Sequence, residues 1–349
     1  MREMIIDGRK IGPAHPPYVI AEMSGNHKGE LARALALIDA AKAAGADAVK
    51  IQSYTADTIT IDHDGPEFRI GGGLWEGRTL YDLYQEASTP WDWHEALFAH
   101  AREIGITLFS SPFDPTAIDM LERLGTPAFK IASFELIDLP LIQYAARTGK
   151  PLIMSTGLAT QTEIEEAVAA VREIGDNPIL LLHCTSGYPT PVAESDLVTI
   201  PYLKTRHGCE IGLSDHTMGT LVPIAAVALG AVAIEKHFTL ARADGGVDSA
   251  FSLEAHELAE LVRSCREAWS ALGKVDDAPK PSEGGGRDFR RSLYVVADVA
   301  TGAVLGPEHV RSIRPGLGLA PKHLPEVLGR RAARDLKRGT PLAWDMLTP

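Results

Sequence analysis

Eight short apolar segments, each followed by a turn and an amphipathic stretch, constrain the fold of this chain more than any other feature. Between them lie stretches such as LARALALIDAAKAAG and QTEIEEAVAAVREIG, in which apolar residues recur near the helical period of about 3.6. Eight strand–helix units in succession predict a closed (β/α)8 barrel, an α/β fold. The apolar segments are YVIAE (18–22), DAVKI (47–51), TLF (107–109), AFKIA (128–132), PLIMS (151–155), ILLLH (179–183), CEIGL (209–213) and VAIEK (232–236).

A doubly wound open sheet is the alternative fold for such an alternation. That fold normally carries a glycine-rich phosphate-binding turn after its first strand. The corresponding segment here, EMSGNHKGE, lacks the GxGxxG pattern, so we expect the barrel. A small hairpin is expected before the barrel, because Asp7-Gly8 is a turn signal between apolar flanks.

A change of composition divides the chain into two domains. Residues 276–289, DDAPKPSEGGGRDF, are rich in proline, glycine and charge, which is typical of a linker. We therefore expect the barrel and hairpin in 1–275 and a small, mostly β module in 290–349. The module has ten Lys and Arg against five acids, a net charge of +5. Because the whole chain carries −12, the residues before the module carry −17. This asymmetry indicates that the module docks on an acidic body or helps to hold an anionic substrate.

Charge and cysteine usage exclude several classes of protein. The net charge of −12 argues against a partner that is nucleic acid or an anionic membrane. No apolar run approaches the roughly 18 residues that cross a bilayer, and the N-terminus lacks the apolar core of a signal peptide. Cys184, Cys209 and Cys265 form no CxxC pair, so we expect buried thiols in a reducing cytoplasm.

Polar side chains end every predicted strand, on the rim where barrel enzymes hold their active sites. Lys50 and Lys130 stand in otherwise apolar strands, and burying a lysine is costly unless an anion accompanies it. With nearby hydroxyl groups they predict a phosphate or carboxylate pocket, unless the lysines point outward or pair with a glutamate. A Schiff base on Lys130 is a further alternative. The hydroxyl groups belong to Ser133, Ser155, Thr156 and Ser214.

Two histidines end the last two predicted strands, which are neighbours in a barrel. His216 and His237 would then lie side by side, and neutral imidazole suits Mn, Zn or Fe(II) while leaving positions open for substrate. Asp215 and Glu235 are candidate outer-sphere or acid–base groups beside such a metal. Glu22 is the candidate general base, with a salt bridge to a rim lysine as its alternative role.

The same segments, in order, resemble the sialic acid synthase family. The resemblance covers nearly the whole chain, and the C-terminal module resembles the SAF, or antifreeze-like, domain of these enzymes. Within the family, LWEGRTLYDLY (74–84) and FTLARADGGVDSAFSLE (238–254) resemble the branch that makes pseudaminic acid. The segments that carry the resemblance are AEMSGNH, DAVKIQ, FSSPFD, FKIASFE, MSTGLAT, LLHCTSGYPTP, IGLSDHTMG, AIEKHFT and RPGLGLAP.

The resemblance implies a condensation of phosphoenolpyruvate with 2,4-diacetamido-2,4,6-trideoxy-altrose. The products would be pseudaminic acid and phosphate, released by cleavage of the C–O bond. It implies Mn²⁺ or Mg²⁺ on His216 and His237, polarising the sugar aldehyde. It also implies that Glu22 handles the proton of the water that adds at C2.

The resemblance further implies ligands for both substrates. Gln52 and Asp248 match positions near the sugar, and Ser186 stands where some relatives have asparagine. Arg314, in IRPGLG, is expected to reach the sugar site from the partner chain of a domain-swapped homodimer. The positions that match the phosphoenolpyruvate site are Lys50, Ser111, Lys130, Ser133, Ser155 and Ser214.

Three alternatives remain open on this reasoning. The first is the same reaction with N-acetylmannosamine or the legionaminate precursor as the sugar. The second is an aldolase that forms a Schiff base on Lys130. The third is a C-terminal module that binds ice or another protein and takes no part in catalysis.

Overall fold

Eight parallel strands close into a barrel in the computed structural model, which describes residues 3–348 of the chain. Each strand overlaps one of the predicted apolar segments, and β10 pairs with β3 to close the ring, which confirms the predicted fold class. The barrel strands are β3 (Tyr18–Glu22), β4 (Ala48–Ser53), β5 (Thr107–Pro112), β6 (Phe129–Ile131), β7 (Leu152–Ser155), β8 (Ile179–Cys184), β9 (Glu210–Asp215) and β10 (Ala233–His237).

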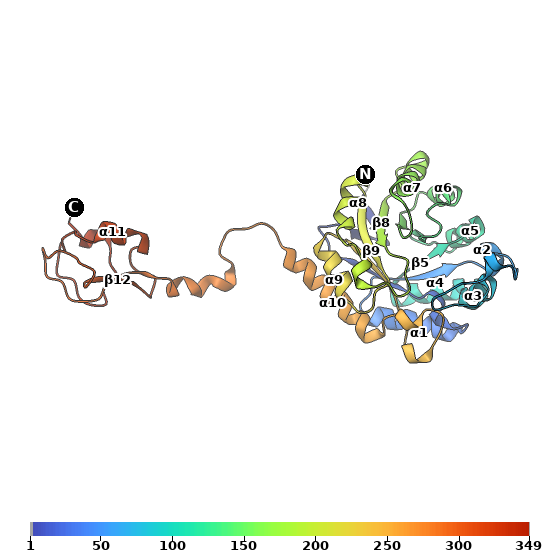
Figure 1. Ribbon diagram of the computed structural model, residues 1–349, viewed down its shortest axis with the longest axis horizontal. Coiled ribbons are helices and arrows are strands. Elements are labelled where there is room, and N and C mark those ends of the chain that lie inside the picture. The colour runs from blue at the N-terminus through green and yellow to red at the C-terminus, as the bar shows by residue number, and fades with distance from the viewer. Residues whose placement is uncertain (1–2, 349) are drawn as a thin grey trace. The chain divides into compact units, whose positions relative to one another are not determined.

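A helix follows each strand and packs on the outside of the barrel (Figure 1). The connection from β4 to α4 is long and carries two further helices, α2 (Ala56–Ile59) and α3 (Leu80–Ala87). The outer helices are α1 (Leu31–Ala43), α4 (His94–Ile104), α5 (Pro115–Arg123), α6 (Leu139–Ala146), α7 (Gln161–Ile174), α8 (Thr199–His207), α9 (Leu221–Ala228) and α10 (Ala255–Leu272).

Helix α7 illustrates why these segments are helical. Its N-cap residue Thr160 accepts a hydrogen bond from the backbone N–H of Glu163, whose carboxylate in turn accepts from the backbone of Thr160. This capping box satisfies two backbone N–H groups that a helix start would leave unpaired. The residues that α7 buries against the strands recur at helical spacing: Ile164, Ala167, Ala170 and Val171.

The barrel interior has an apolar lower layer. Side chains alternate between the two faces of a strand, so every second residue points inward. The hairpin of β1 (Met4–Ile6) and β2 (Arg9–Ile11) adds Met4, Ile6 and Ile11 to this layer. Its turn residues Asp7 and Gly8 have φ of 48° and 76°, as a tight hairpin turn requires. The barrel residues of the layer are Tyr18, Ile20, Ala48, Phe109, Ala128, Ile153, Leu180, Leu182, Val232 and Ala233.

The chain divides into two compact units after Gly273. The second unit contains β11 (Ser292–Val295) paired antiparallel with β12 (Val310–Ile313), and the short helix α11 (Leu324–Val327). Its own core includes Leu293, Val295 and Leu342. Part of the segment expected as a linker forms a 3-10 helix, Pro281–Phe289. Within residues 3–348, no helix combines the length and apolar character needed to cross a membrane.

Candidate active site

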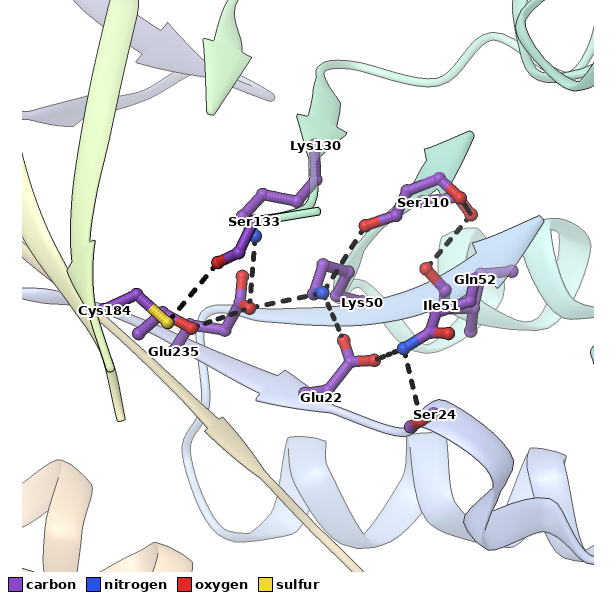
Figure 2. A network of polar contacts seen from close by, with 12 residues as sticks. Glu22, Ser24, Lys50, Ile51, Gln52, Ser110, Lys130, Ser133, Cys184 and Glu235 are labelled. Carbon is purple, nitrogen blue, oxygen red and sulfur yellow. Dashed lines mark hydrogen bonds and ion pairs between the residues drawn. The ribbon is translucent and has the colours of Figure 1, made fainter. Parts of the chain in front are cut away.

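Two buried glutamates and two buried lysines form a network of ion pairs at the carboxyl end of the barrel (Figure 2). Lys50 Nζ lies 2.9 Å from Glu22 Oε2 and 3.2 Å from Glu235 Oε1. Lys130 Nζ lies 3.4 Å from the same oxygen of Glu235. The pairing of lysine with glutamate, one of the alternatives for these lysines, is therefore present.

Strand alternation places this network directly above the apolar layer. Glu22 stands two residues after the inward-pointing Ile20 on β3, and Lys50 stands two residues after Ala48 on β4. In the same way, Glu235 follows Ala233 on β10. Each charged residue thus shares a face with an apolar residue one layer deeper. The polar network lies at the rim because the inward-pointing residues of β3, β4 and β10 change from apolar to charged at the same level of the barrel.

Burial and mutual charge shift the pKa values of these groups in different directions. Burial raises the pKa of Glu22, with Lys50 opposing it. Burial also disfavours the charge of Glu235, but Lys130 and Lys50 outweigh it and hold the pKa below its usual range. The two glutamates likewise raise the pKa of Lys50 against the effect of burial. Burial lowers the pKa of Lys130, which contacts the carboxylate of Glu235 and no other carboxylate among the described residues, so an incoming anion would stabilise its charged form.

Asp215 does not contact this network in the structure, and its expected catalytic role stays a prediction. Its carboxylate accepts hydrogen bonds from Lys236 and from the backbone and hydroxyl groups of Thr217. The reason is strand alternation, because Ser214 points inward and Asp215 therefore points outward. Asp215 and Lys236 form a buried ion pair behind the sheet, with side chains 2% and 1% exposed.

Two predicted hydroxyl groups contact the network directly. Ser111 accepts a hydrogen bond of 3.4 Å from Lys50 Nζ. Ser214 donates one of 3.4 Å to Glu235 Oε1. Both serines point inward from β5 and β9, toward the charged network.

The remaining predicted hydroxyl groups differ in their orientation. Ser155 Oγ is buried and has no hydrogen-bond partner among the described residues, so it is free to bind a ligand oxygen. Ser133 accepts from the backbone N–H of Gly157 at 3.2 Å and lies next to the site. Thr156 instead donates to the carbonyl of Leu182 at 3.2 Å, so its hydroxyl is satisfied by the barrel wall.

The two predicted histidines lie side by side above the network. The ring centroids of His216 and His237 are 5.4 Å apart, and Tyr188 packs against both rings. His216 Nδ1 donates to the carbonyl of Thr185 at 2.9 Å, which leaves Nε2 as the ligating atom. The Nδ1 atom of His237 is buried without a partner in the described part of the chain.

These histidines fit a metal that is held by two imidazoles and by substrate or water. Burial holds the pKa of His237 well below its usual range, the direction that favours the neutral ring a metal ligand needs. Cys184 raises the pKa of His216 against the effect of burial. Across residues 3–348, no group of three or more His, Cys, Asp and Glu side chains is arranged to hold a metal. A metal held by His216 and His237 alone would keep its other positions open to substrate or water.

Gln52 and Asp248 also lie at the rim, joined by a serine that the sequence analysis missed. Gln52 Nε2 donates to Glu22 Oε1 at 2.9 Å and to Ser24 Oγ at 3.2 Å. Ser24 Oγ donates to Asp248 Oδ2 at 2.5 Å. Two carboxylates from opposite ends of the barrel sequence are thus linked through two neutral groups. The inward alternation from Glu22 could have pointed to Ser24.

Cys184 lies among the predicted site residues. It is buried as expected, but its sulfur accepts from Ser133 Oγ at 3.5 Å and lies 3.8 Å from Ser186 Oγ and from His216 Nδ1. The thiol therefore has polar neighbours, because it points inward two residues after Leu182. The predicted site residue Ser186 lies next to it.

Two loops meet above the rim. The indole N–H of Trp75 donates to the carbonyl of Val247 at 2.8 Å, and Val247 packs with Leu83 and Ala87. Trp75 also contacts Tyr188, with ring centroids 5.7 Å apart. These loops are the two segments that resemble the pseudaminic acid branch, so the structure brings the branch-specific residues together.

Arg314 belongs to the second unit. It directly follows β12 and its side chain is exposed. Its expected contact with the sugar remains a prediction.

A closed parallel barrel with lysines, glutamates and paired imidazoles at its carboxyl rim defines a barrel enzyme built to act on an anionic substrate. The comparison with protein families identifies which one. The chain belongs to the NeuB family, whose model matches residues 37–277, and it carries a SAF domain over residues 290–348. The resemblance to sialic acid synthases is confirmed.

Several relatives are similar over almost their whole length. Pseudaminic acid synthase of Helicobacter pylori is 43% identical, with 95% of this chain and 97% of the relative covered. Pseudaminic acid synthase of Campylobacter jejuni is 45% identical, with 93% and 95% covered. Among solved structures, the N-acetylneuraminic acid synthetase of Leptospira borgpetersenii in complex with citrate matches with a TM-score of 0.73. It is 34% identical, with 82% of this chain and 95% of that chain covered.

Proposed function

We propose that this enzyme is a pseudaminic acid synthase. It condenses phosphoenolpyruvate with 2,4-diacetamido-2,4,6-trideoxy-altrose and water, and releases pseudaminic acid and phosphate. The names of the relatives at 43–45% identity support this sugar. The observation that carries the proposal is the buried lysine–glutamate network beneath the paired histidines, because lysines suit an anionic substrate and imidazoles suit a metal that would polarise an aldehyde.

Lys50 and Lys130 bind the phosphate and carboxylate groups of phosphoenolpyruvate. Charge-assisted hydrogen bonds from lysine suit both groups. Ser111 and Ser214 already contact the network, and the unpaired hydroxyl of Ser155 adds a donor. The charge of Lys130 is neutralised by carboxylates less than that of Lys50, so the anion binds most favourably to Lys130.

His216 and His237 would hold a divalent ion, Mn²⁺ or Mg²⁺. Such an ion supplies a Lewis acid for the aldehyde oxygen of the open-chain sugar. Gln52 and Asp248 bind the sugar from the neighbouring side of the rim. The loops that meet at Trp75 and Val247 exclude water from this side and distinguish the sugar from its stereoisomers.

The new C–C bond forms between C3 of phosphoenolpyruvate and the aldehyde carbon. The aldehyde oxygen takes up a proton. A water molecule adds at C2, and this water loses a proton as it adds. The tetrahedral intermediate then expels phosphate with cleavage of the C–O bond. Glu22 accepts the proton of that water. Burial raises the pKa of its carboxyl, which makes it a stronger base, and the nearby charge of Lys50 keeps the carboxylate form available.

The active enzyme is a homodimer in the cytoplasm, and each sugar site is completed by Arg314 of the partner subunit. The net charge of +5 on residues 290–349 favours docking on the acidic body of either barrel. The three cysteines are free, as a reducing compartment requires.

The test is phosphate release from phosphoenolpyruvate with three purified sugars: the 2,4-diacetamido altrose, its legionaminate counterpart and N-acetylmannosamine. We expect the highest kcat/KM with the altrose. A preference for either other sugar would contradict the proposed substrate within the same reaction class. Borohydride trapping of substrate on Lys130, unaffected by chelators, would instead identify a Schiff-base aldolase.

A further inference from the structure

The side-chain amide of Gln52 uses both of its N–H groups inside the protein. One donates to Glu22 Oε1 at 2.9 Å and the other to Ser24 Oγ at 3.2 Å (Figure 2). A glutamine amide has two donor hydrogens and one carbonyl oxygen. The carbonyl oxygen of Gln52 has no hydrogen bond to any residue in the described range, and the side chain is half-buried at the rim. It is therefore the polar atom that Gln52 offers to a ligand.

The hydroxyl of Ser24 and the carboxylate of Glu22 set this arrangement together. The single hydrogen of the Ser24 hydroxyl is donated to Asp248 Oδ2 at 2.5 Å, so its oxygen faces Gln52 as an acceptor. Asp248 is itself held in place, because its backbone carbonyl accepts from Ser252 Oγ at 2.7 Å. An amide rotated by half a turn would direct the carbonyl of Gln52 at the carboxylate of Glu22. Two acceptors would then meet without a proton between them.

The backbone of Ser24 is unusual for a residue with a side chain. Its φ is 46°, in the left-handed region that favours glycine. The next residue, Gly25, is packed so tightly that an added Cβ would lie 2.4 Å from Val247 Cγ2. Ser24 thus keeps a strained backbone conformation in a closely packed turn, and in that conformation its side chain links Gln52 to Asp248.

We propose that Ser24 is a positioning residue that makes Gln52 a hydrogen-bond acceptor only, so that the sugar group facing Gln52 must be a donor, either a hydroxyl or an acetamido N–H. This inference rests on the proposed function, which places the sugar beside Gln52. It states that Gln52 accepts one hydrogen bond from the sugar, and that Ser24 determines specificity by orienting Gln52.

The experiment uses four analogues of the altrose sugar in the phosphate-release assay. Two carry fluorine in place of the hydroxyl at C3 or C5, and two carry acetoxy in place of the acetamido group at C2 or C4. Each analogue removes one donor and leaves an acceptor. Wild type should lose about ten-fold or more in kcat/KM with one of the four, because a site built to hydrogen-bond a group rejects an analogue that lacks it. In Gln52→Ala the same analogue should carry no extra penalty.

Ser24→Ala frees one N–H of Gln52 to donate, so the penalty for that analogue should shrink several-fold while the KM for phosphoenolpyruvate is unchanged. Ser24→Gly relieves the positive φ and should show the same loss of discrimination. The matched control is Ser195→Ala, since Ser195 is a buried serine whose hydroxyl has no partner in the described residues. It should keep the wild-type pattern.

Three results would overturn the proposal. The first is that no analogue shows a penalty that depends on Gln52. The second is that Ser24→Ala keeps the wild-type pattern, and the third is that Ser24→Gly keeps it, which would give Ser24 a backbone role only. Absence of turnover of the parent sugar by wild type would overturn the proposed function and this inference with it. Turnover of the parent with an unchanged analogue pattern would overturn the inference alone.

Discussion

Glu22 and Lys50 are register partners on adjacent strands, and their side chains form an ion pair of 2.9 Å in which both are almost fully buried. The pair joins the candidate base to the candidate anion site. It also means that the charge of Lys50 is already compensated before substrate arrives. We therefore expect Lys130, whose Nζ lies 3.4 Å from Glu235 Oε1, to contribute more than Lys50 to the binding of an anionic substrate.

Replacing Lys50 with methionine should cost more stability than replacing Lys130. Lys50 is shared by two buried carboxylates, and breaking a buried ion pair costs about 3–5 kcal/mol. Lys130 contacts one carboxylate at 3.4 Å, so Lys130→Met should cost less. Urea unfolding measures the difference. Both variants should raise the KM for phosphoenolpyruvate by about ten-fold or more, and an unchanged KM in both would remove them from the anion site.

His216→Ala and His237→Ala should each lose bound Mn²⁺ and turnover. Changes in the outer sphere of a metal site cost about 10–100-fold, so the loss of a ligand should cost more. Electron paramagnetic resonance of added Mn²⁺ reports binding independently of activity. His100→Ala is the control, because His100 pairs with Asp39 on the surface of the barrel. Full activity of either site variant in excess chelator would exclude the metal.

Asp215→Asn and Lys236→Met should act on stability, since this ion pair is buried behind the sheet. Each single change leaves one buried charge unpaired and should cost about 3–5 kcal/mol in unfolding free energy. The double variant should recover part of that loss, because no charge is then left alone. Lys337→Met, which breaks an exposed ion pair with Asp298, should leave stability unchanged. Asp215→Asn with full stability but no turnover would support the predicted catalytic role of Asp215.

Stability should fall as the pH rises, in part because of Glu135. Burial raises the pKa of its carboxyl to about 7, so the folded chain binds this proton more tightly than the unfolded chain does. The contribution of Glu135 is therefore most favourable below its ordinary pKa and is lost as the pH rises from about 4.5 to about 7. Glu135→Gln should be more stable than wild type at pH 8, by about 1–3 kcal/mol.

Urea unfolding at pH 4.5 and pH 8 checks this prediction. The exposed Glu260 provides the control, and Glu260→Gln should follow the wild-type pH dependence. Identical profiles for Glu135→Gln and wild type would show that the Glu135 carboxyl ionises normally.

Inactive Glu22→Gln chains mixed with inactive Arg314→Ala chains should recover some activity. In a mixed dimer, one barrel has an intact Glu22 and receives an intact Arg314 from its neighbour. Phosphate release is measured after subunit exchange, with native mass spectrometry to prove that mixed dimers formed. No recovery in the presence of such dimers would mean that Arg314 acts within its own chain or not at all.

The local order of residues along each strand could be predicted well from the sequence. Apolar segments such as YVIAE specify strands, and a period of two decides that Glu22 and Ile20 share a face. In a parallel barrel, the same alternation also predicts that Lys50, Lys130, His216 and His237 point inward at the rim. These features depend on neighbours a few residues apart, and short-range patterning encodes them directly.

Which rim residues meet was decided by the tertiary structure alone. The hydrogen bond from Ser24 to Asp248 spans 224 residues and exists because β10 closes against β3. The ion pair of Lys50 with Glu22 comes from the register of β3 and β4, and its pairing with Glu235 depends on the closure of β10 against β3. Whether Asp215 faces the site or the outer helices depends on a single step of strand register. The sequence thus determined the barrel and the kinds of groups at its rim, while ring closure and register determined which of those groups act together.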